Sequence, residues 1–497
     1  MSIRIEVLTE PKLRFGKAAA GVEPRLELAH SGPYTAFTGP PRKLELGLVC
    51  LAPEREPIRR WFDSMERLLA GEEANAERFR EFPGTVKALN CSFVIPDAFV
   101  RVIDAGERAR IARLHPVKRF EALLDLYTRK VEGLFVDGGP ATVIVALPEE
   151  EAELRILNPK LSQNERDLLE HLQQQEDRQT DLFTPDPDEL KRMAELKPQS
   201  EELLYRRFYR ALKARLMQKR NAVPIQVVRE HTWRNEKATQ SPATRAWNLA
   251  VSLFYKTGNM PWKPRDLPEN YCFIGLSFHH LKRQGGDVMY ASVAQAFSTT
   301  VLPFVLRGAV LGRDQLRRRQ PYLTESQSAD LITRVIKAYE DLAGVRPDRV
   351  VVHKTSRYQP EEVAGFEVGR TLVPAIDLIW LAQTGFRLVK KGVDEVWRGT
   401  LVNVNDADHY LFTTGFVPWW REYPGPHIPS PLRFGCPHDT DLTQRAREIL
   451  ALTKMNWNSS DGLARYPVTI SFARRVGTIM TELADDPEPN PSYRFYM

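Results

Sequence analysis

The sequence predicts an α/β protein with two domains. Its 497 residues are enough for two or more domains with separate cores. In the first half, continuous apolar segments such as ATVIVALP alternate with amphipathic helices such as VKRFEALLDLYTRKVEGLF, a pattern typical of a largely parallel sheet. In the second half, strands come first and two helices follow, which favours a ribonuclease-H-like layer with a mixed sheet.

Composition excludes several classes of protein. A net charge of +6 suits a nucleic-acid partner but is also common among enzymes. The four cysteines form no CxxC pair, which argues against a disulfide scaffold or a zinc ribbon. No segment reads as an export signal or approaches the ~18 apolar residues of a membrane span. We therefore expect a soluble, cytoplasmic protein without a membrane partner.

The first domain is expected to follow a short arm. Residues 1–40 are strand-like pieces broken by Pro and Gly, and they predict an arm packed on the rest of the chain. Residues 41–265 then form the first domain, with a buried strand in LELGLVCLA and a further strand in CSFVIP. Within this domain, residues 149–200 are acidic and Gln-rich, which predicts a helical or partly mobile insertion.

The second domain is expected to span residues 266–497. The strand YCFIGLSFHH opens it, VMYASVAQAFS and VLPFVLRGAVL read as hairpin partners, and DRVVVHKTS is a buried strand with a polar tip. VWRGTLVNVNDADHYLFTTGFVP predicts another hairpin, and the helices LTQRAREILALTKMNW and TISFARRVGTIMTELA come last. The apolar final residues, SYRFYM, suggest a docked C-terminus, since frayed termini are usually polar.

A basic stretch near the domain boundary contains the main candidate site. YRRFYRALKARLMQKR predicts a helix on which Tyr209 and Lys213 share a face, and the strand entry VPIQVVRE follows with Gln226. On a second helix, SPATRAWNLAVSLFYKTGNMPW, a polar stripe contains Arg245, Asn248, Ser252 and Lys256. These groups could bind a phosphate. Spacing alone favours a solvated basic face instead.

A ribonuclease-H-like nuclease needs carboxylates at its first and central strands to hold two metal ions. The first strand here offers Ser277 and the central strand offers Thr355, and neither hydroxyl replaces a carboxylate as a ligand for a hard cation. No GxGxxG, GxSxG or P-loop motif suggests another chemistry. The residues therefore favour binding over catalysis.

Taken together, these segments resemble the short prokaryotic Argonautes, which consist of MID and PIWI domains without N or PAZ domains. LKARLMQKRNAVPIQVVRE and NLAVSLFYKTGNMPWKP are similar to the two halves of the MID pocket. CFIGLSF, VVVHKTSRYQPEE, RGTLVNVNDADHYLFTTGFVP and YPVTISFARRVG follow the order of PIWI motifs. The resemblance covers almost the whole chain and implies a Rossmann-like MID domain followed by a ribonuclease-H-like PIWI domain.

The resemblance also implies roles for particular residues. Tyr209, Lys213, Gln226 and Lys256 match the residues that hold the 5′-phosphate of a guide, and Asn248 matches a polar contact to its first nucleotides. The carboxylate of Met497 is expected to join this pocket through a bridging Mg²⁺ ion that is structural, not catalytic. The catalytic tetrad is expected to be lost, with Ser277, Thr355 and Ser471 at its Asp positions.

Proteins of this kind are expected to pair a short RNA guide with single-stranded DNA. The resemblance implies a heterodimer with a protein that carries an APAZ region and an effector, which is a sirtuin-like enzyme, a TIR enzyme or a nuclease, in defence against plasmids or phages. Two alternatives stay open. One is a guided endonuclease with unrecognised metal ligands, and the other is an interaction protein without a guide.

Overall fold

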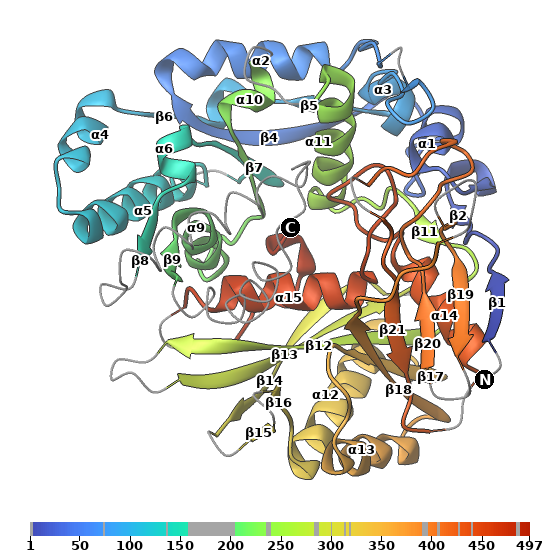
Figure 1. Ribbon diagram of the computed structural model, residues 1–497. Coiled ribbons are helices and arrows are strands. Elements are labelled where there is room, and N and C mark those ends of the chain that lie inside the picture. The colour runs from blue at the N-terminus through green and yellow to red at the C-terminus, as the bar shows by residue number, and fades with distance from the viewer. Residues whose placement is uncertain are drawn as a thin grey trace.

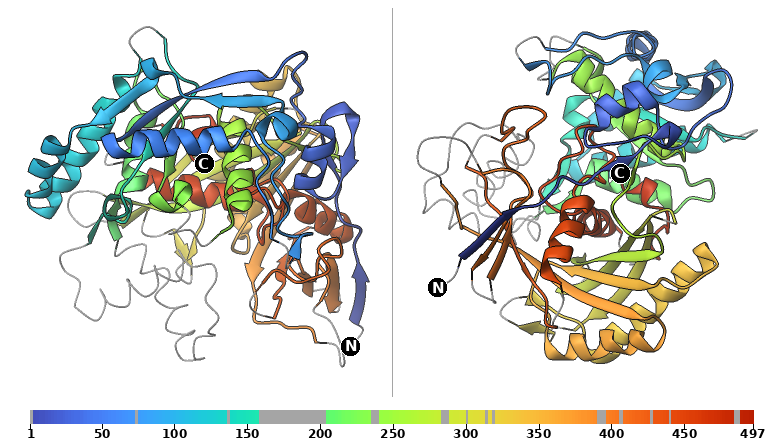
Figure 2. Two further views of the ribbon diagram at one scale, coloured as in Figure 1. Left: turned by 90° about the horizontal axis from the view of Figure 1, so that it is seen from above. Right: turned by 90° about the vertical axis from the view of Figure 1, so that its right-hand side faces the viewer.

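The computed structural model describes residues 3–72, 75–135, 138–157, 204–234, 240–282, 288–299, 301–312, 315–317, 320–389, 396–404, 408–425, 428–438, 441–483 and 488–497. Two large sheets lie one above the other, with helices between and around them (Figures 1 and 2). The predicted α/β class is confirmed.

The first sheet is entirely parallel. Its strand order is β10-β7-β4-β5, and β6 pairs with the second half of β4. The strands are β4 (Arg42–Leu51), β5 (Cys91–Val94), β6 (Val100–Ile103), β7 (Thr142–Ala146) and β10 (Ile225–Val228). Both predicted segments, LELGLVCLA and ATVIVALP, are strands of this sheet. Their continuous apolar sequences follow from helices that cover both faces.

Different helices cover the two faces of this sheet. Leu48 of β4 belongs to a core cluster with Trp61 of helix α2 (Arg55–Ser64), whereas the neighbouring Val49 belongs to another. That second cluster includes Leu124 of α5 (Pro116–Glu132) and Leu216 of α9 (Phe208–Met217). Alternate residues of a strand point to opposite faces, so β4 lies between the two cores. The other helices of this half are α3 (Thr85–Leu89), α4 (Ala105–Ala112), α6 (Glu149–Ala152), α10 (Glu230–Trp233) and α11 (Pro242–Lys256).

The second sheet has nine strands in the order β1-β19-β20-β21-β18-β17-β12-β13-β14. Neighbours in the β12-β17-β18 group are parallel, and the other pairs are antiparallel, as the predicted mixed sheet requires. Both predicted hairpins are present. The strands are β1 (Ile3–Val7), β12 (Tyr271–Lys282), β13 (Val288–Ser298), β14 (Phe304–Leu311), β17 (Arg349–Lys354), β18 (Ala375–Gln383), β19 (Thr400–Val404), β20 (Asp408–Leu411) and β21 (Leu432–Gly435).

Helices also cover both faces of the second sheet. Helices α12 (Glu325–Ala343) and α13 (Pro360–Glu367) bury their apolar residues in one cluster with Ile274 and Val350. On the other face, α14 (Leu442–Leu452) and α15 (Val468–Met480) share a cluster with residues of α11 and of the first sheet. The two domains are therefore joined by a continuous apolar core. Helix α15 lies between the sheets (Figure 1).

The N-terminal arm packs against the rest of the chain, as predicted. Strand β1 pairs antiparallel with β19 at the edge of the second sheet. The short strand β2 (Leu13–Arg14) joins β3 (Ala20–Gly21) and β11 (Lys263–Pro264), and α1 (Pro24–Ser31) follows. Two further strands, β15 (Leu316–Arg317) and β16 (Gln320–Pro321), pair only with each other among the described residues.

The predicted start of the first basic helix was wrong. The helix was expected from residue 205, but Leu204–Arg207 form strand β9, which pairs antiparallel with β8 (Arg155–Leu157), and α9 begins only at Phe208. This pairing across residues far apart in sequence outweighs local helix propensity. The predicted insertion at 149–200 begins with α6 and β8, and its remainder from residue 158 lies outside the described residues. Within the described part, no helix is long and apolar enough to cross a membrane.

Candidate anion-binding site

The predicted basic stretch meets the end of the chain inside the molecule. Lys213 on α9 is 2% exposed, and its Nζ donates to the main-chain oxygen of Met497, which is also 2% exposed. The neighbouring Tyr493 and Tyr496 are fully buried, and the Tyr493 ring stacks on Phe472 of α15 at 3.6 Å between centroids. The prediction that the apolar tail is docked is confirmed.

Lys256 reaches the same region from the last turn of α11. Its Nζ donates to the Ile225 main-chain oxygen at 2.9 Å and to Oε1 of Gln226 at 2.6 Å. The Ser252 hydroxyl, one turn earlier on α11, lies 3.3 Å from the same Gln226 oxygen. Tyr209 lies one turn before Lys213, and the Lys213 Nζ is 4.6 Å from the centre of its ring. The structure thus brings together Tyr209, Lys213, Gln226 and Lys256.

The two buried lysines of this site have no acidic side chain as a partner in the described ranges. Burial lowers the pKa of Lys213 and of Lys256 well below the ordinary range, and the nearby Arg475 guanidinium lowers both further. Lys213 also lowers the pKa of Lys256. In the described ranges, no Asp or Glu side chain forms an ion pair with either lysine; acceptors are a main-chain oxygen, an amide oxygen and Met497. Such a cluster favours an anion as its ligand.

Asn248 lies beside this cluster, one turn before Ser252. Its Oδ1 accepts hydrogen bonds from the main-chain nitrogen of Ser460 at 3.0 Å and from the Ser460 hydroxyl at 2.8 Å. Asn248, Gln226 and Ser252 also line a pocket of about 300 Å³ that lies over the end of β10. Asn248 therefore tethers α11 to the second domain and also lines a cavity together with Gln226, the partner of Lys256.

The alternative that spacing alone favours, a solvated polar face, is wrong for the second helix. Arg245 is 7% exposed, Ser252 5% and Lys256 1%, and all three hydrogen-bond within the protein. Arg245 donates to the main-chain oxygens of His231 and Thr232. Helix α11 has its apolar stripe in the core and its polar stripe against β10, α10 and Ser460. The stripe is polar because it satisfies buried groups.

The three hydroxyl positions lie in one region of the second domain. Leu276 of β12 pairs in parallel register with Lys354 of β17, so Ser277 and Thr355 each come one residue after this paired position. A Cβ on Gly275 would lie 2.0 Å from the Thr469 main-chain oxygen, so the first turn of α15, which contains Ser471, lies against β12. Within the described residues, no group of three or more His, Cys, Asp or Glu side chains could hold a metal ion.

The lysine cluster does not fit a divalent cation by itself. The Met497 oxygen is the expected metal ligand, and Lys213 already donates to it. Oε1 of Gln226 is similarly engaged by Lys256 and Ser252. Magnesium takes six oxygen ligands, and the cations of this cluster would repel it unless a bound phosphate supplied both charge and oxygens.

Two basic residues of the site were not identified from the sequence. Arg475 comes from α15 in the second domain, and Arg494, near the end of the chain, lies 3.4 Å from the main-chain oxygen of Lys256. Neither could be placed from the first basic stretch, because both approach it only after the second domain folds over α9 and α11. The sole sequence signal is the basic pair in FARRVG, which stands within an otherwise apolar helix.

The chain was compared with known proteins. No family model matches it. A curated Argonaute from Aquifex aeolicus is 23% identical over 276 residues, which are 55% of this chain and 36% of that protein. Among solved structures, Clostridium butyricum Argonaute bound to a guide DNA and a 19-mer target DNA has a TM-score of 0.62 at 15% identity. That match covers 99% of this chain and 55% of that one.

Two other solved structures are similar to this chain over nearly its whole length. Aquifex aeolicus Argonaute with externally bound siRNA has a TM-score of 0.58 at 15% identity. The match covers 98% of this chain and 56% of that one. Drosophila Piwi has a TM-score of 0.58 at 13% identity, and the match covers 99% of this chain and 56% of that one. This chain spans about half the length of these structures. It has the fold of Argonaute and Piwi proteins, with a Rossmann-like MID domain followed by a ribonuclease-H-like PIWI domain.

Proposed function

We propose that this chain belongs to the Argonaute family and anchors the 5′-phosphate of a short RNA guide. The observation that carries the proposal is the pair of buried lysines, Lys213 and Lys256, with Arg475 nearby and no acidic side chain to pair with them in the described residues. A terminal phosphate dianion would supply the missing negative charge. Tyr209 would stack on the first base, and the pocket beside Gln226 and Asn248 would hold polar groups of the first nucleotides.

The wider function follows from the resemblance to short prokaryotic Argonautes. The guide would pair with complementary single-stranded DNA, so that base pairing reads the sequence while the protein holds the backbone. The chain itself would not cleave, because hydroxyls stand at Ser277, Thr355 and Ser471. Recognition would activate an APAZ-containing partner whose effector acts in the cytoplasm against invading DNA.

The bound nucleic acid is the most direct test. The full chain is purified, the nucleic acid that co-purifies is extracted, and the 5′ ends are mapped by sequencing with and without prior phosphatase treatment. Short RNAs with 5′-phosphates are the expected result. If no short 5′-phosphorylated strand co-purifies, the chain is an interaction protein whose basic groups serve another partner.

The lysine pair should discriminate between guide ends. In Lys213→Met plus Lys256→Met, affinity for a 5′-phosphorylated guide should fall about 100-fold or more, because two charge-assisted hydrogen bonds are lost. Affinity for a 5′-hydroxyl guide should change little. Fluorescence anisotropy with both guides measures the ratio. The matched control is Lys219→Met plus Arg220→Met, which removes two charges beyond the end of α9. Equal losses for both guides would refute the pocket.

Cleavage and metal dependence can be tested together. Guide-loaded protein is incubated with labelled complementary DNA in Mg²⁺, in Mn²⁺ and in EDTA. Intact target is expected in all three, and reproducible cleavage at one phosphodiester would establish the guided endonuclease instead. The same solutions test the Mg²⁺ ion predicted between the guide phosphate and Met497. Its presence predicts weaker guide binding in EDTA, and the residual affinity in EDTA measures what the lysines contribute alone.

A further inference from the structure

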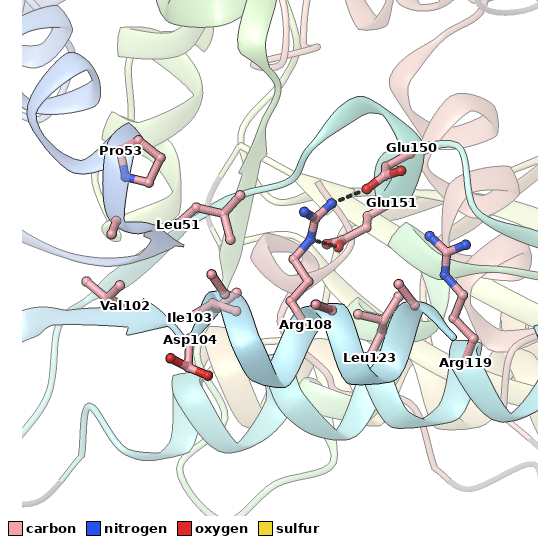
Figure 3. A pocket seen from close by; sticks show the side chains of 14 residues that line it. Leu51, Pro53, Val102, Ile103, Asp104, Arg108, Arg119, Leu123, Glu150 and Glu151 are labelled. Carbon is pink, nitrogen blue, oxygen red and sulfur yellow. Dashed lines mark hydrogen bonds and ion pairs between the residues drawn. The ribbon is translucent and has the colours of Figure 1, made fainter. Parts of the chain in front are cut away.

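A second cavity lies at a different place in the first domain. It has a volume of about 400 Å³ and is lined by the ends of β4 and β6, by α4 and α5, and by α6. None of the residues that line it also lines the pocket beside Gln226. A ligand there would not share contacts with the 5′-phosphate. Figure 3 shows the labelled side chains around this cavity.

The cavity lies where the direction of the sheet connections reverses. Strand β4 ends at Leu51 and leads to α2 on one face, while the adjacent parallel strand β6 ends at Ile103 and leads to α4 and α5. Helices α2 and α5 belong to the cores on opposite faces of the sheet. Neighbouring connections that leave in opposite directions open a crevice at the carboxyl ends of the strands, the place where open α/β sheets bind ligands.

Most of the lining is apolar. Leu51, Pro53, Val102, Ile103 and Leu123 line the cavity, and small alanine side chains on α4 complete the apolar part of the lining. The volume lies within the range of about 300–1,000 Å³ that small-molecule sites occupy. A ring or short aliphatic chain would lose its contact with water here, so the body of the ligand should be apolar.

Charged residues in the lining differ in whether they have partners. The Arg108 guanidinium pairs with Glu150 and, at 2.5 Å, with Glu151, and Glu151 also accepts from the Tyr127 hydroxyl. Asp104 accepts from the Glu107 main-chain nitrogen at 2.7 Å and caps α4. All three carboxylates are thus engaged.

Arg119, in the first turn of α5, is the exception. The residue is half-buried, and its Nε is buried and meets no acceptor among the described residues. Figure 3 shows its guanidinium at one end of the cavity, without the dashed contacts that Arg108 makes. A buried guanidinium nitrogen without an acceptor is costly, and an anionic group on a ligand would satisfy it.

We propose that this crevice binds a small amphipathic anion, in which an apolar ring or chain occupies the cavity and a phosphate or carboxylate pairs with Arg119. Both nucleoside monophosphates and aryl carboxylates have this chemistry. The site is separate from the one proposed for the guide, and the inference does not depend on that function.

Isothermal titration calorimetry on the full chain tests the proposal. The probes are matched pairs that differ in the charged group: AMP against adenosine, and indole-3-acetate against tryptamine. Saturable binding is expected for AMP, for indole-3-acetate or for both. The anion that binds shows whether the ligand is a nucleoside monophosphate or an aryl carboxylate. No saturable heat with either anion, or binding of adenosine or tryptamine as tight as that of its anionic counterpart, would overturn the proposal.

Variants assign the binding to this cavity. Arg119→Met should weaken binding of the anion about tenfold or more, the contribution of one charge-assisted pair. Ala109→Trp should abolish it by filling the cavity from α4. Lys118→Met removes the adjacent charge on α5, which does not line the cavity, and should leave binding unchanged. Thermal unfolding confirms that each variant is folded. Anion binding unaffected by both Arg119→Met and Ala109→Trp would place the ligand elsewhere and refute the inference.

Discussion

At the scale of single residues, Lys213 and Lys256 combine deep burial with like-charge neighbours. Burial is the main cause of both lowered pKa values; the next is Arg475 for Lys213 and Lys213 itself for Lys256. Between the lowered pKa and the ordinary value of 10.5, the unfolded chain holds more protons than the folded one. These two residues therefore make the unliganded protein less stable as the pH falls through this window. A bound anion reverses the effect by favouring the charged amines.

The proposed binding of a guide phosphate at these lysines should consequently take up protons. In the window between the lowered lysine pKa values and 10.5, a guide phosphate whose second pKa of about 6 has been passed is already a dianion, so proton uptake reports on the protein. Calorimetric titrations of a 5′-phosphorylated guide in Tris and in HEPES should give different enthalpies, because the two buffers release protons with different heats. The difference should vanish in Lys213→Met plus Lys256→Met. Identical enthalpies for the wild type in both buffers would show that the lysines do not change protonation.

The sequence predicted part of this site. Tyr209 and Lys213 could be paired because a helix places residues four apart on one face. Spacing could not show that Lys256 would be buried, because burial depends on β10 and on the end of the chain. Nor could it show Arg475, which is 262 positions after Lys213 and comes near it only through the packing of α15.

At the scale of elements, helix α15 depends on a close approach to β12. The space beside Gly275 is filled by the main chain of Thr469, whose oxygen lies 2.0 Å and carbonyl carbon 2.4 Å from the place of a Cβ. His353 of β17 adds a side-chain contact, with its Nδ1 2.8 Å from the Thr469 hydroxyl, and burial lowers the pKa of this imidazole to about 3. Because His353 stays neutral near pH 7, this contact places no charge in the core.

Gly275→Ala should therefore destabilise the fold. Main-chain atoms cannot swing aside as a side chain can, so α15 would have to shift, at a cost of about 2 kcal/mol or more. Urea unfolding followed by tryptophan fluorescence measures the change. Gly385→Ala is the control, because a Cβ there meets nothing within 4 Å. A Gly275 variant as stable as the control would mean that α15 does not lie this close to β12.

Element prediction succeeded where local pattern and tertiary packing agree. Helix α12 ends at Ala343, where the sequence supplies a glycine: Gly344 follows with φ of +75°, which glycine adopts without strain. The start of α9 was misplaced because Leu204–Arg207 pair with β8, a strand about 50 residues earlier. The local sequence does not show that pairing.

At the scale of the whole molecule, a buried charge cluster ties the N-terminal arm to the second domain. The Glu10 carboxylate accepts hydrogen bonds from Nε of Arg398 at 3.2 Å and from Nζ of Lys454 at 2.8 Å. Lys454 also donates to the main-chain oxygen of Val22. Burial acts to raise the pKa of Glu10, but the two cations outweigh it and the pKa is lowered. The arm is thus held by charge as well as by the pairing of β1 with β19.

Glu10→Gln should destabilise the protein by about 3 kcal/mol, because it leaves two buried cations without their counter-charge. The lowered pKa means that this stabilisation is present above the ordinary value of 4.5 and is lost as the pH falls through the lowered pKa. The difference between wild type and variant in thermal unfolding should therefore shrink in acid. Glu269→Gln, which breaks an exposed pair with Arg14, should have almost no effect. A constant difference at every pH would exclude Glu10 as its source.

The lysine cluster has a final consequence for experiments that divide the chain. Lys213 and Lys256 come from the first domain, whereas Arg475 and Met497 come from the second. Neither half expressed alone would contain the whole cluster, however well it folded. Domain fragments should therefore bind guides weakly and give a misleading negative, while mixing the two fragments offers a complementation assay in which the guide's phosphate reports their reassembly.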